Sequence, residues 1–143
     1  MKPIDRMNEK PIFIFPQYLL IAILNSLIFN AYLKSTGLPG GAVGMIPLVV
    51  MLFSLITFIT SLIIFLILLK QKINLNSTKY ILLYQSIYLI VLIVAGQNPF
   101  EKGLEKEFKE ITIWIYFASF LATASLIIIL WFLKIVNRRR QNI

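Results

Sequence analysis

The chain contains no cysteine and no histidine. Without cysteine, disulfide bonds, thiolate metal sites and thiol catalysis are excluded. Without histidine, the chain lacks the commonest general base and the commonest metal ligand in proteins. Charged residues are also scarce, at 14% of 143 residues, whereas a soluble domain has about 25%. We therefore expect no cofactor, no metal site and no catalytic activity.

Hydrophobic residues, in contrast, make up 59% of the chain. A helix needs about 20 apolar residues to cross about 30 Å of hydrocarbon. Four runs free of Asp, Glu, Lys and Arg meet or nearly meet this length, the third being the shortest. The sequence predicts an all-α polytopic membrane protein, a four-transmembrane-helix bundle forming one domain over residues 1–143, with spans at 12–33, 45–69, 80–97 and 111–133.

The basic residues between and beyond these runs predict an orientation. Cytoplasmic segments of membrane proteins carry an excess of Lys and Arg. With both termini in the cytoplasm, four basic residues lie outside and ten lie inside, namely Lys2, Arg6, Lys10, Lys70, Lys72, Lys79, Lys134, Arg138, Arg139 and Arg140. We therefore predict cytoplasmic N and C termini. Because the basic residues flank apolar runs, the net charge of +8 indicates no nucleic-acid partner.

Tryptophan and tyrosine near the ends of the runs support the same four spans. Trp114 and Trp131 bracket the fourth run, Tyr18 and Tyr32 bracket the first, and Tyr80 marks the start of the third. Trp and Tyr are enriched where the bilayer meets water. We therefore expect these five side chains to lie at the membrane interfaces.

No Asp, Glu, Lys or Arg interrupts the four runs. Such groups usually persist in membranes because they relay protons, pair with ions or bind substrates. Small multidrug transporters have a similar four-span topology but depend on a membrane-embedded carboxylate, and thiol oxidoreductases of similar topology depend on cysteines. The chain resembles these proteins in topology alone, and no family is indicated.

Neutral polar residues remain as candidates for a site inside the membrane. One residue from each run falls near mid-depth, and a second asparagine lies close by in the first run. The candidate polar cluster is Asn25, Asn30, Thr57, Tyr88 and Thr123. Buried amides and hydroxyls need partners, so these residues either bind helices to one another or line a polar cavity for a small ligand. The spacing Ala118-x-x-x-Ala122 favours close helix packing.

The loop between the first two runs is rich in glycine and has no charge from Ser35 to Pro47. Gly37 suits the left-handed position that ends a helix, and Pro47 suits the first turn of the next one. The other three glycines, Gly40, Gly41 and Gly44, have no such explanation. They form either part of a plain connector or a loop that contacts a partner or ligand.

The third loop predicts a short amphipathic helix outside the membrane. Asn98 and Pro99 suit the start of a helix. Apolar side chains then recur every three to four residues, at Phe100, Leu104, Phe108 and Ile111. Glutamates and lysines fill the positions between them. Such a segment rests on the membrane surface as a turn or offers a docking surface to a partner protein.

These observations favour a non-catalytic protein of the bacterial inner membrane, acting as an accessory, assembly or structural subunit. The abundance of isoleucine and lysine favours a bacterial source. The expected partners are the lipid bilayer and either another membrane protein or further copies of the chain. The alternative is a small oligomeric transporter or channel with a neutral polar site in the bundle. An integral membrane enzyme ranks third, because no nucleophile–base pair is present.

Overall fold

The computed structural model describes residues 13–37, 42–73, 75–103 and 106–141, and these residues form four helices and no strand. The helices are α1 (Ile14–Thr36), α2 (Ala42–Lys70), α3 (Ser77–Val94) and α4 (Lys106–Gln141). Each is long and apolar enough to cross a membrane. The prediction of an all-helical fold with four helices long and apolar enough to span a membrane is confirmed. At 18 residues, α3 is the shortest helix, as predicted.

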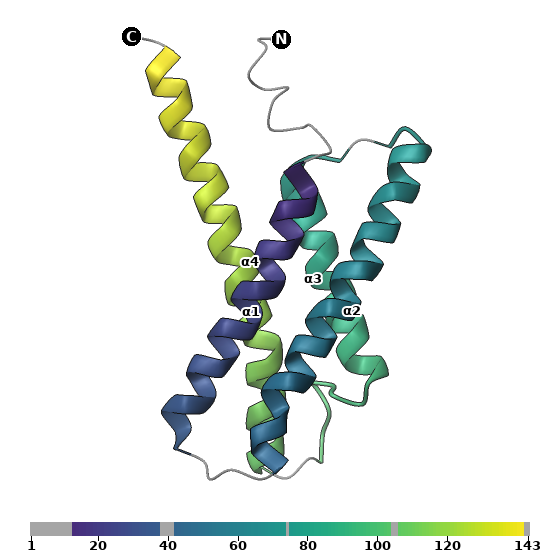
Figure 1. Ribbon diagram of the computed structural model, residues 1–143, viewed down its shortest axis with the longest axis vertical. Coiled ribbons are helices and arrows are strands. Elements are labelled where there is room, and N and C mark those ends of the chain that lie inside the picture. The colour runs from purple at the N-terminus through teal and green to yellow at the C-terminus, as the bar shows by residue number, and fades with distance from the viewer. Residues whose placement is uncertain (1–12, 38–41, 74, 104–105, 142–143) are drawn as a thin grey trace.

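The four helices form a closed ring in chain order (Figure 1). Each helix packs against its neighbours in sequence, and α4 returns to pack against α1. Successive helices run in opposite directions, so the start of α1, the end of α4 and the α2–α3 connection share one end of the bundle. A smaller contact between α1 and α3 crosses the interior. The interior is therefore lined by one face of every helix.

The helix ends follow the residues that cap them, with one difference from expectation. α1 ends at Gly37, which adopts the predicted left-handed conformation with φ 62°. The side chain of Asn76 accepts a hydrogen bond from the Lys79 backbone N–H at 3.1 Å and begins α3. α2 begins at Ala42, so Pro47 lies inside the helix and not in its first turn. Proline is tolerated there because the only bond it removes is close to the helix start.

Two apolar clusters fill the bundle, one toward each end. The first contains Ile14, Tyr18, Ile21, Phe65, Tyr80, Ile81, Tyr84, Ala122 and Leu126. The second contains Phe29, Val50, Phe53, Tyr88, Leu92, Ile115 and Ala118. Both draw side chains from all four helices. In lipid such packing stabilises a bundle by van der Waals contact, since the surrounding acyl chains are equally apolar.

Two of the five tyrosines and tryptophans expected at the interfaces have side chains buried between the helices. Tyr18 is fully buried, its ring packs 5.4 Å from that of Tyr84, and its hydroxyl donates to the Tyr80 carbonyl oxygen at 3.2 Å. Tyr80 is also buried. Both residues lie near the start of a helix, but their side chains face other helices and not the surroundings of the bundle. Their depth at the membrane interface stays a prediction. Trp131, in contrast, is exposed on the outside of α4.

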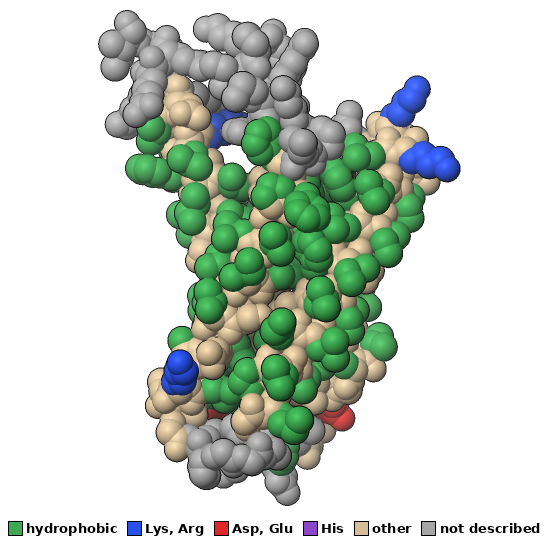
Figure 2. Space-filling view, viewed as in Figure 1, with side chains coloured by type: hydrophobic (Ala, Val, Ile, Leu, Met, Phe, Trp, Pro, Cys, Tyr) green, Lys and Arg blue, Asp and Glu red, His purple; other side chains and the backbone are tan. Residues whose placement is uncertain are grey.

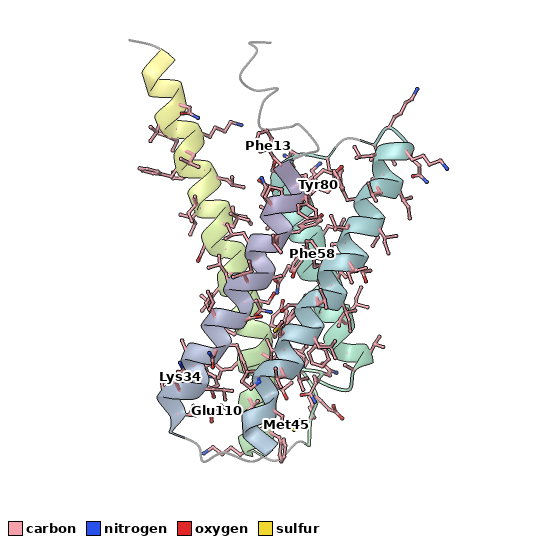
Figure 3. All side chains as sticks on the ribbon, viewed as in Figure 1. Phe13, Lys34, Met45, Phe58, Tyr80 and Glu110 are labelled. Atoms are coloured by element: carbon pink, nitrogen blue, oxygen red, sulfur yellow. The ribbon has the colours of Figure 1, made fainter. Side chains whose placement is uncertain are left out.

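The outside of the bundle is apolar between its two ends. Figure 2 shows hydrophobic side chains over the middle of the visible face, with Lys and Arg near both ends and acidic side chains near one end. Lys34, Met45 and Glu110 lie toward the end that holds the α1–α2 connection, and Phe13 and Tyr80 lie toward the other (Figure 3). This distribution matches that of a protein whose middle is surrounded by lipid.

The third loop is partly described. Asn98 accepts a hydrogen bond from the Phe100 backbone N–H at 3.0 Å through its side chain, and its carbonyl accepts from Glu101 at 3.2 Å. These bonds form a turn. Residues 104 and 105 lie outside the described part of the chain, and α4 continues from Lys106 into the membrane-spanning segment without a break. The separate amphipathic helix stays a prediction.

Candidate functional site

A layer of polar side chains crosses the bundle between the two apolar clusters. Asn25, Thr57, Gln85 and Thr123 each stand at or next to the midpoint of a candidate span, one on each helix. Ser54 and Ser119 lie within one helical turn of these midpoints. All six are buried. The layer, defined as Asn25, Ser54, Thr57, Gln85, Ser119 and Thr123, therefore lies at mid-depth.

Helical periodicity explains why α2 contributes to this layer. Its buried positions recur every three to four residues, at Val50, Phe53, Ser54, Thr57, Ser61 and Phe65. Side chains at this spacing share one face of a helix. Because the central members are hydroxyl residues and the outer members are apolar, the same face supplies both the polar layer and the two apolar clusters.

The hydrogen bonds on one side of the layer join α1, α2 and α3. The Asn25 Nδ2 donates to Ser54 Oγ at 2.8 Å. Ser54 Oγ donates in turn to the Val50 carbonyl at 2.9 Å. The Tyr84 hydroxyl donates to the Ser54 carbonyl oxygen at 3.4 Å. Ser54 is therefore the residue through which three helices meet.

The hydrogen bonds on the other side join α3 to α4. Gln85 Oε1 accepts from Ser119 Oγ at 2.9 Å and from Thr123 Oγ1 at 3.4 Å. The small residues Ala118 and Ala122 flank these hydroxyls on α4 and are fully buried. Small side chains at a spacing of four allow close approach of helix backbones. The burial of Ala118 and Ala122 is consistent with the predicted packing of this stretch of α4.

Tyr88 lies next to the layer and is fully buried. Its hydroxyl faces the side chains of Asn25 and Ser54, yet no hydrogen bond of ordinary geometry reaches it. Thr57 Oγ1 and Asn25 Oδ1 are also buried without a partner in the described structure. This part of the bundle therefore contains more hydrogen-bonding atoms than the hydrogen bonds between them can satisfy.

The structure buries four of the five residues predicted for the polar cluster. Asn25, Thr57, Tyr88 and Thr123 are all buried in the bundle. Asn30 is not part of this group, since it is half-buried and forms no hydrogen bond with any described residue. The residues that carry most of the bonds, Ser54, Tyr84, Gln85 and Ser119, were missing from the predicted cluster. The predicted run 80–97 is centred next to Tyr88, and only the observed start of α3 at Ser77 places Gln85 at the middle of the span.

The predicted contact loop falls largely outside the described residues, since Gly40 and Gly41 belong to residues 38–41. Gly44 is described, lies in the first turn of α2 and is exposed. A Cβ added to it would meet no atom within 4 Å. Among the described residues, none therefore packs closely against the Cα of Gly44. Whether the loop is a connector or a contact surface stays open.

The chemistry available to the polar layer is neutral. Its members are amides and hydroxyls, and within the described ranges no group of three or more acidic side chains gathers that could hold a metal ion. Amides and hydroxyls can donate and accept hydrogen bonds but do not supply charge. The layer is suited to joining helices and to holding small neutral molecules.

No family model matches this chain, and no curated protein or solved structure is significantly similar to it. The function is therefore argued from the residues and their geometry.

Proposed function

We propose that this chain is a small non-catalytic protein of the bacterial inner membrane that acts as an accessory, assembly or structural subunit of a membrane complex. One observation carries the proposal. Asn30 is a half-buried polar residue in an apolar helix and has no hydrogen-bond partner among the described residues. A partner on another chain would supply what its own bundle does not.

The depth of Asn30 in the membrane determines how much an unpaired amide would cost. It lies five residues from Asn25, which stands at the midpoint of α1, and five residues correspond to about 7.5 Å along a helix. The half-thickness of the hydrocarbon core is about 15 Å, so the amide lies within it. An unpaired amide there costs several kcal/mol. Asparagine in this setting bonds across helices, which favours either a partner helix or a second copy of the chain.

Three other half-buried or exposed hydroxyls near mid-depth need no such partner. Ser26 Oγ donates to the Ala22 carbonyl at 3.1 Å, Thr60 Oγ1 to Ile56 at 2.8 Å, and Ser86 Oγ to Leu82 at 3.0 Å. Each is therefore satisfied by its own helix. Among the described residues, Asn30 and the exposed Ser125 of α4 lack such a bond. Asn30 is the contact position we propose, because it is half-buried and carries an amide with both donors and acceptors to satisfy.

The proposed orientation places the termini in the cytoplasm. Lys70, Lys72, Lys79 and Lys134 occupy the end of the bundle that holds the α2–α3 connection, and an excess of basic residues favours the cytoplasmic side. The lack of native cysteine provides a clean test. Lys72→Cys should resist a membrane-impermeant maleimide in intact cells, and Lys102→Cys should react. The reverse pattern would contradict the proposed orientation.

We propose that the third loop lies outside the cell membrane and is a docking surface. Its residues would form the predicted amphipathic helix when they contact a partner protein or the membrane surface. Phe100 and Phe108 are large apolar side chains left mostly exposed in this region. Exposed aromatic side chains flanked by charged residues are suited to a membrane surface or a protein interface. The Phe100 ring also packs edge-on against the Tyr116 ring of α4, with 6.1 Å between the ring centroids. This contact holds the loop against α4.

The test of the proposal is purification of the chain from native membranes into a mild detergent or nanodiscs. We expect a stoichiometric partner or a homo-oligomer, and we expect Asn30→Leu to reduce its recovery severalfold. Ser26→Ala is the matched control, because it removes a hydroxyl that is bonded within its own helix. A strictly monomeric chain that co-purifies with nothing would contradict the proposal.

The alternative is a small oligomeric transporter or channel, and the unpartnered polar atoms of Asn25, Thr57 and Tyr88 favour it. These atoms would contact a small neutral permeant at mid-depth. A flux assay with the purified chain in liposomes is the test. If Asn25→Leu and Tyr88→Phe left the flux of every permeant unchanged, this role for the polar residues would be wrong.

A further inference from the structure

Buried polar atoms without partners are concentrated in the middle of the bundle. Among the described residues, six side-chain atoms are buried and form no hydrogen bond. One of them, Gln17 Oε1, lies in the first turn of α1. The other five lie in the middle third of α1, α2 or α3, namely Asn25 Oδ1, Thr57 Oγ1, Ser61 Oγ, Gln85 Nε2 and Tyr88 Oη.

The hydroxyls of Thr57 and Ser61 are unusual for a helix. Serine and threonine inside helices often donate to the carbonyl three or four residues earlier, and Ser54 and Thr60 on the same helix do so. Thr57 and Ser61 do not, although both face the interior. Their hydroxyls are therefore buried polar groups that the backbone of α2 does not satisfy.

Three of the five atoms belong to one locus between α1, α2 and α3. Asn25 and Ser54 are hydrogen-bonded at 2.8 Å, and the Tyr88 hydroxyl faces both of these side chains. Thr57 lies one helical turn from Ser54 on the same buried face. The locus therefore presents Asn25 Oδ1, which only accepts hydrogen bonds, beside two hydroxyls that can both donate and accept.

We propose that this locus is a binding site for internal water, held by Asn25 Oδ1, Thr57 Oγ1 and the Tyr88 hydroxyl. A water molecule that donates to Asn25 Oδ1 and accepts from the Tyr88 hydroxyl satisfies both. Buried waters in proteins make about three such bonds to otherwise unpaired groups. The hydrocarbon around the bundle offers no other source of partners. This inference does not depend on the proposed function.

The surroundings select water over larger or charged ligands. Asn25, Thr57 and Tyr88 are each 0% exposed, so the occupant must be small. A cation would need a compensating negative charge in a medium of low dielectric, and none of the four candidate spans has an acidic residue near mid-depth. A neutral molecule with two donors and two acceptors fits this set of groups.

Solid-state NMR of the ¹⁵N-labelled chain in lipid bilayers tests the site through transfer of magnetisation from water. The Asn25 side-chain signal is assigned by its loss in Asn25→Gln. We expect it to receive water magnetisation at a rate close to that of the exposed Asn76 side chain. A rate as slow as that of the backbone amides of Ile21 and Leu92, which lie in the apolar clusters, would overturn the proposal.

Stability measurements on variants of nearly equal shape provide an independent test. The direction of the change in stability distinguishes a bonded hydroxyl from an unbonded one. If Thr57 Oγ1 bonds to water, Thr57→Val removes a bond and raises the unfolding equilibrium constant about threefold, the average for such bonds in membranes. If the hydroxyl has no partner, its removal relieves a desolvation penalty, so a variant as stable as the parent or more stable overturns the proposal. Thr60→Val is the matched control on the same helix. Tyr88→Phe should also abolish rapid water transfer to Asn25.

Discussion

Asn25 on α1 donates a hydrogen bond of 2.8 Å to Ser54 on α2, and both side chains are buried at mid-depth. Ser54 also accepts the Tyr84 hydroxyl of α3 through its carbonyl. A single residue of α2 thus joins two other helices at the level where hydrocarbon offers no competing partner. The relative positions of α1, α2 and α3 depend on this contact as well as on the apolar clusters on either side of it.

The Asn25–Ser54 bond should be measurable as a coupling energy. We expect a double-mutant cycle with Asn25→Leu and Ser54→Ala to give about 0.6 kcal/mol, and at most about 1.7 kcal/mol. The measurement is reversible unfolding of the purified chain in mixed micelles or bicelles. Strictly additive single variants would mean that the two side chains are not bonded in the membrane.

Ser119 should contribute more to the α3–α4 contact than its neighbour Ser125. Ser119 Oγ donates to Gln85 at 2.9 Å inside the bundle, whereas Ser125 is exposed on α4. We expect Ser119→Ala to lower the free energy of unfolding by about 0.6–1.7 kcal/mol and Ser125→Ala to leave it within about 0.5 kcal/mol. Equal effects at the two positions would show that Gln85 is not held by Ser119.

Enlarging the small residues of α4 should disrupt its packing. Ala118 and Ala122 are 0% exposed, so the added atoms of leucine have no room unless the neighbouring helices move. Ala118→Leu and Ala122→Leu should each lower the free energy of unfolding by about 1–3 kcal/mol. Ser125→Leu, on the exposed side, is the control for added bulk and should be nearly neutral. A neutral effect at Ala118 and Ala122 would contradict the packing described above.

Two glycines at the ends of the first loop should respond in opposite directions to alanine. Gly37 has φ 62°, and a side chain in the left-handed region costs about 1–2 kcal/mol, so Gly37→Ala should destabilise the chain. Gly44 is helical with open space around its Cα, so Gly44→Ala should stabilise α2 by about 0.4–1 kcal/mol.

Thermal unfolding of the two variants measures this difference. The same pair of variants also bears on the proposed contact loop. If Gly44→Ala is stable but loses a partner that Gly37→Ala retains, then Gly44 belongs to an interface. Retention of the partner by both variants would assign Gly44 to the connector.

Much of the fold was predictable because its signals are local. The number of spans follows from uninterrupted apolar length, since each hydrocarbon crossing requires about 20 residues. The end of α1 follows from Gly37, because the left-handed conformation strongly favours glycine. The start of α2 was placed a turn too late, since Pro47 is tolerated at more than one position near a helix start.

The interior contacts were less predictable because they depend on how each helix is rotated. Every helix of this chain is apolar on nearly all sides, so hydrophobic periodicity does not identify the buried face. Tyr18 could equally face the membrane interface or another helix, and only the packing against Tyr80 and Tyr84 decides between them. Asn30 presents the converse case, because its type suggests a buried partner and its rotation leaves it at the edge of the bundle.

The sequence alone establishes the membrane class, the four spans, the neutral character of the intramembrane side chains and the absence of cysteine and histidine chemistry. These follow from length, charge and residue type, which do not depend on how the helices are arranged. The tertiary structure decides that Ser54 and Gln85 are the residues through which the helices are joined, and that Asn25, Thr57 and Tyr88 retain unpaired polar atoms. Such contacts depend on how the separate helices are rotated and spaced relative to one another. The residue pattern of any single helix does not determine that arrangement.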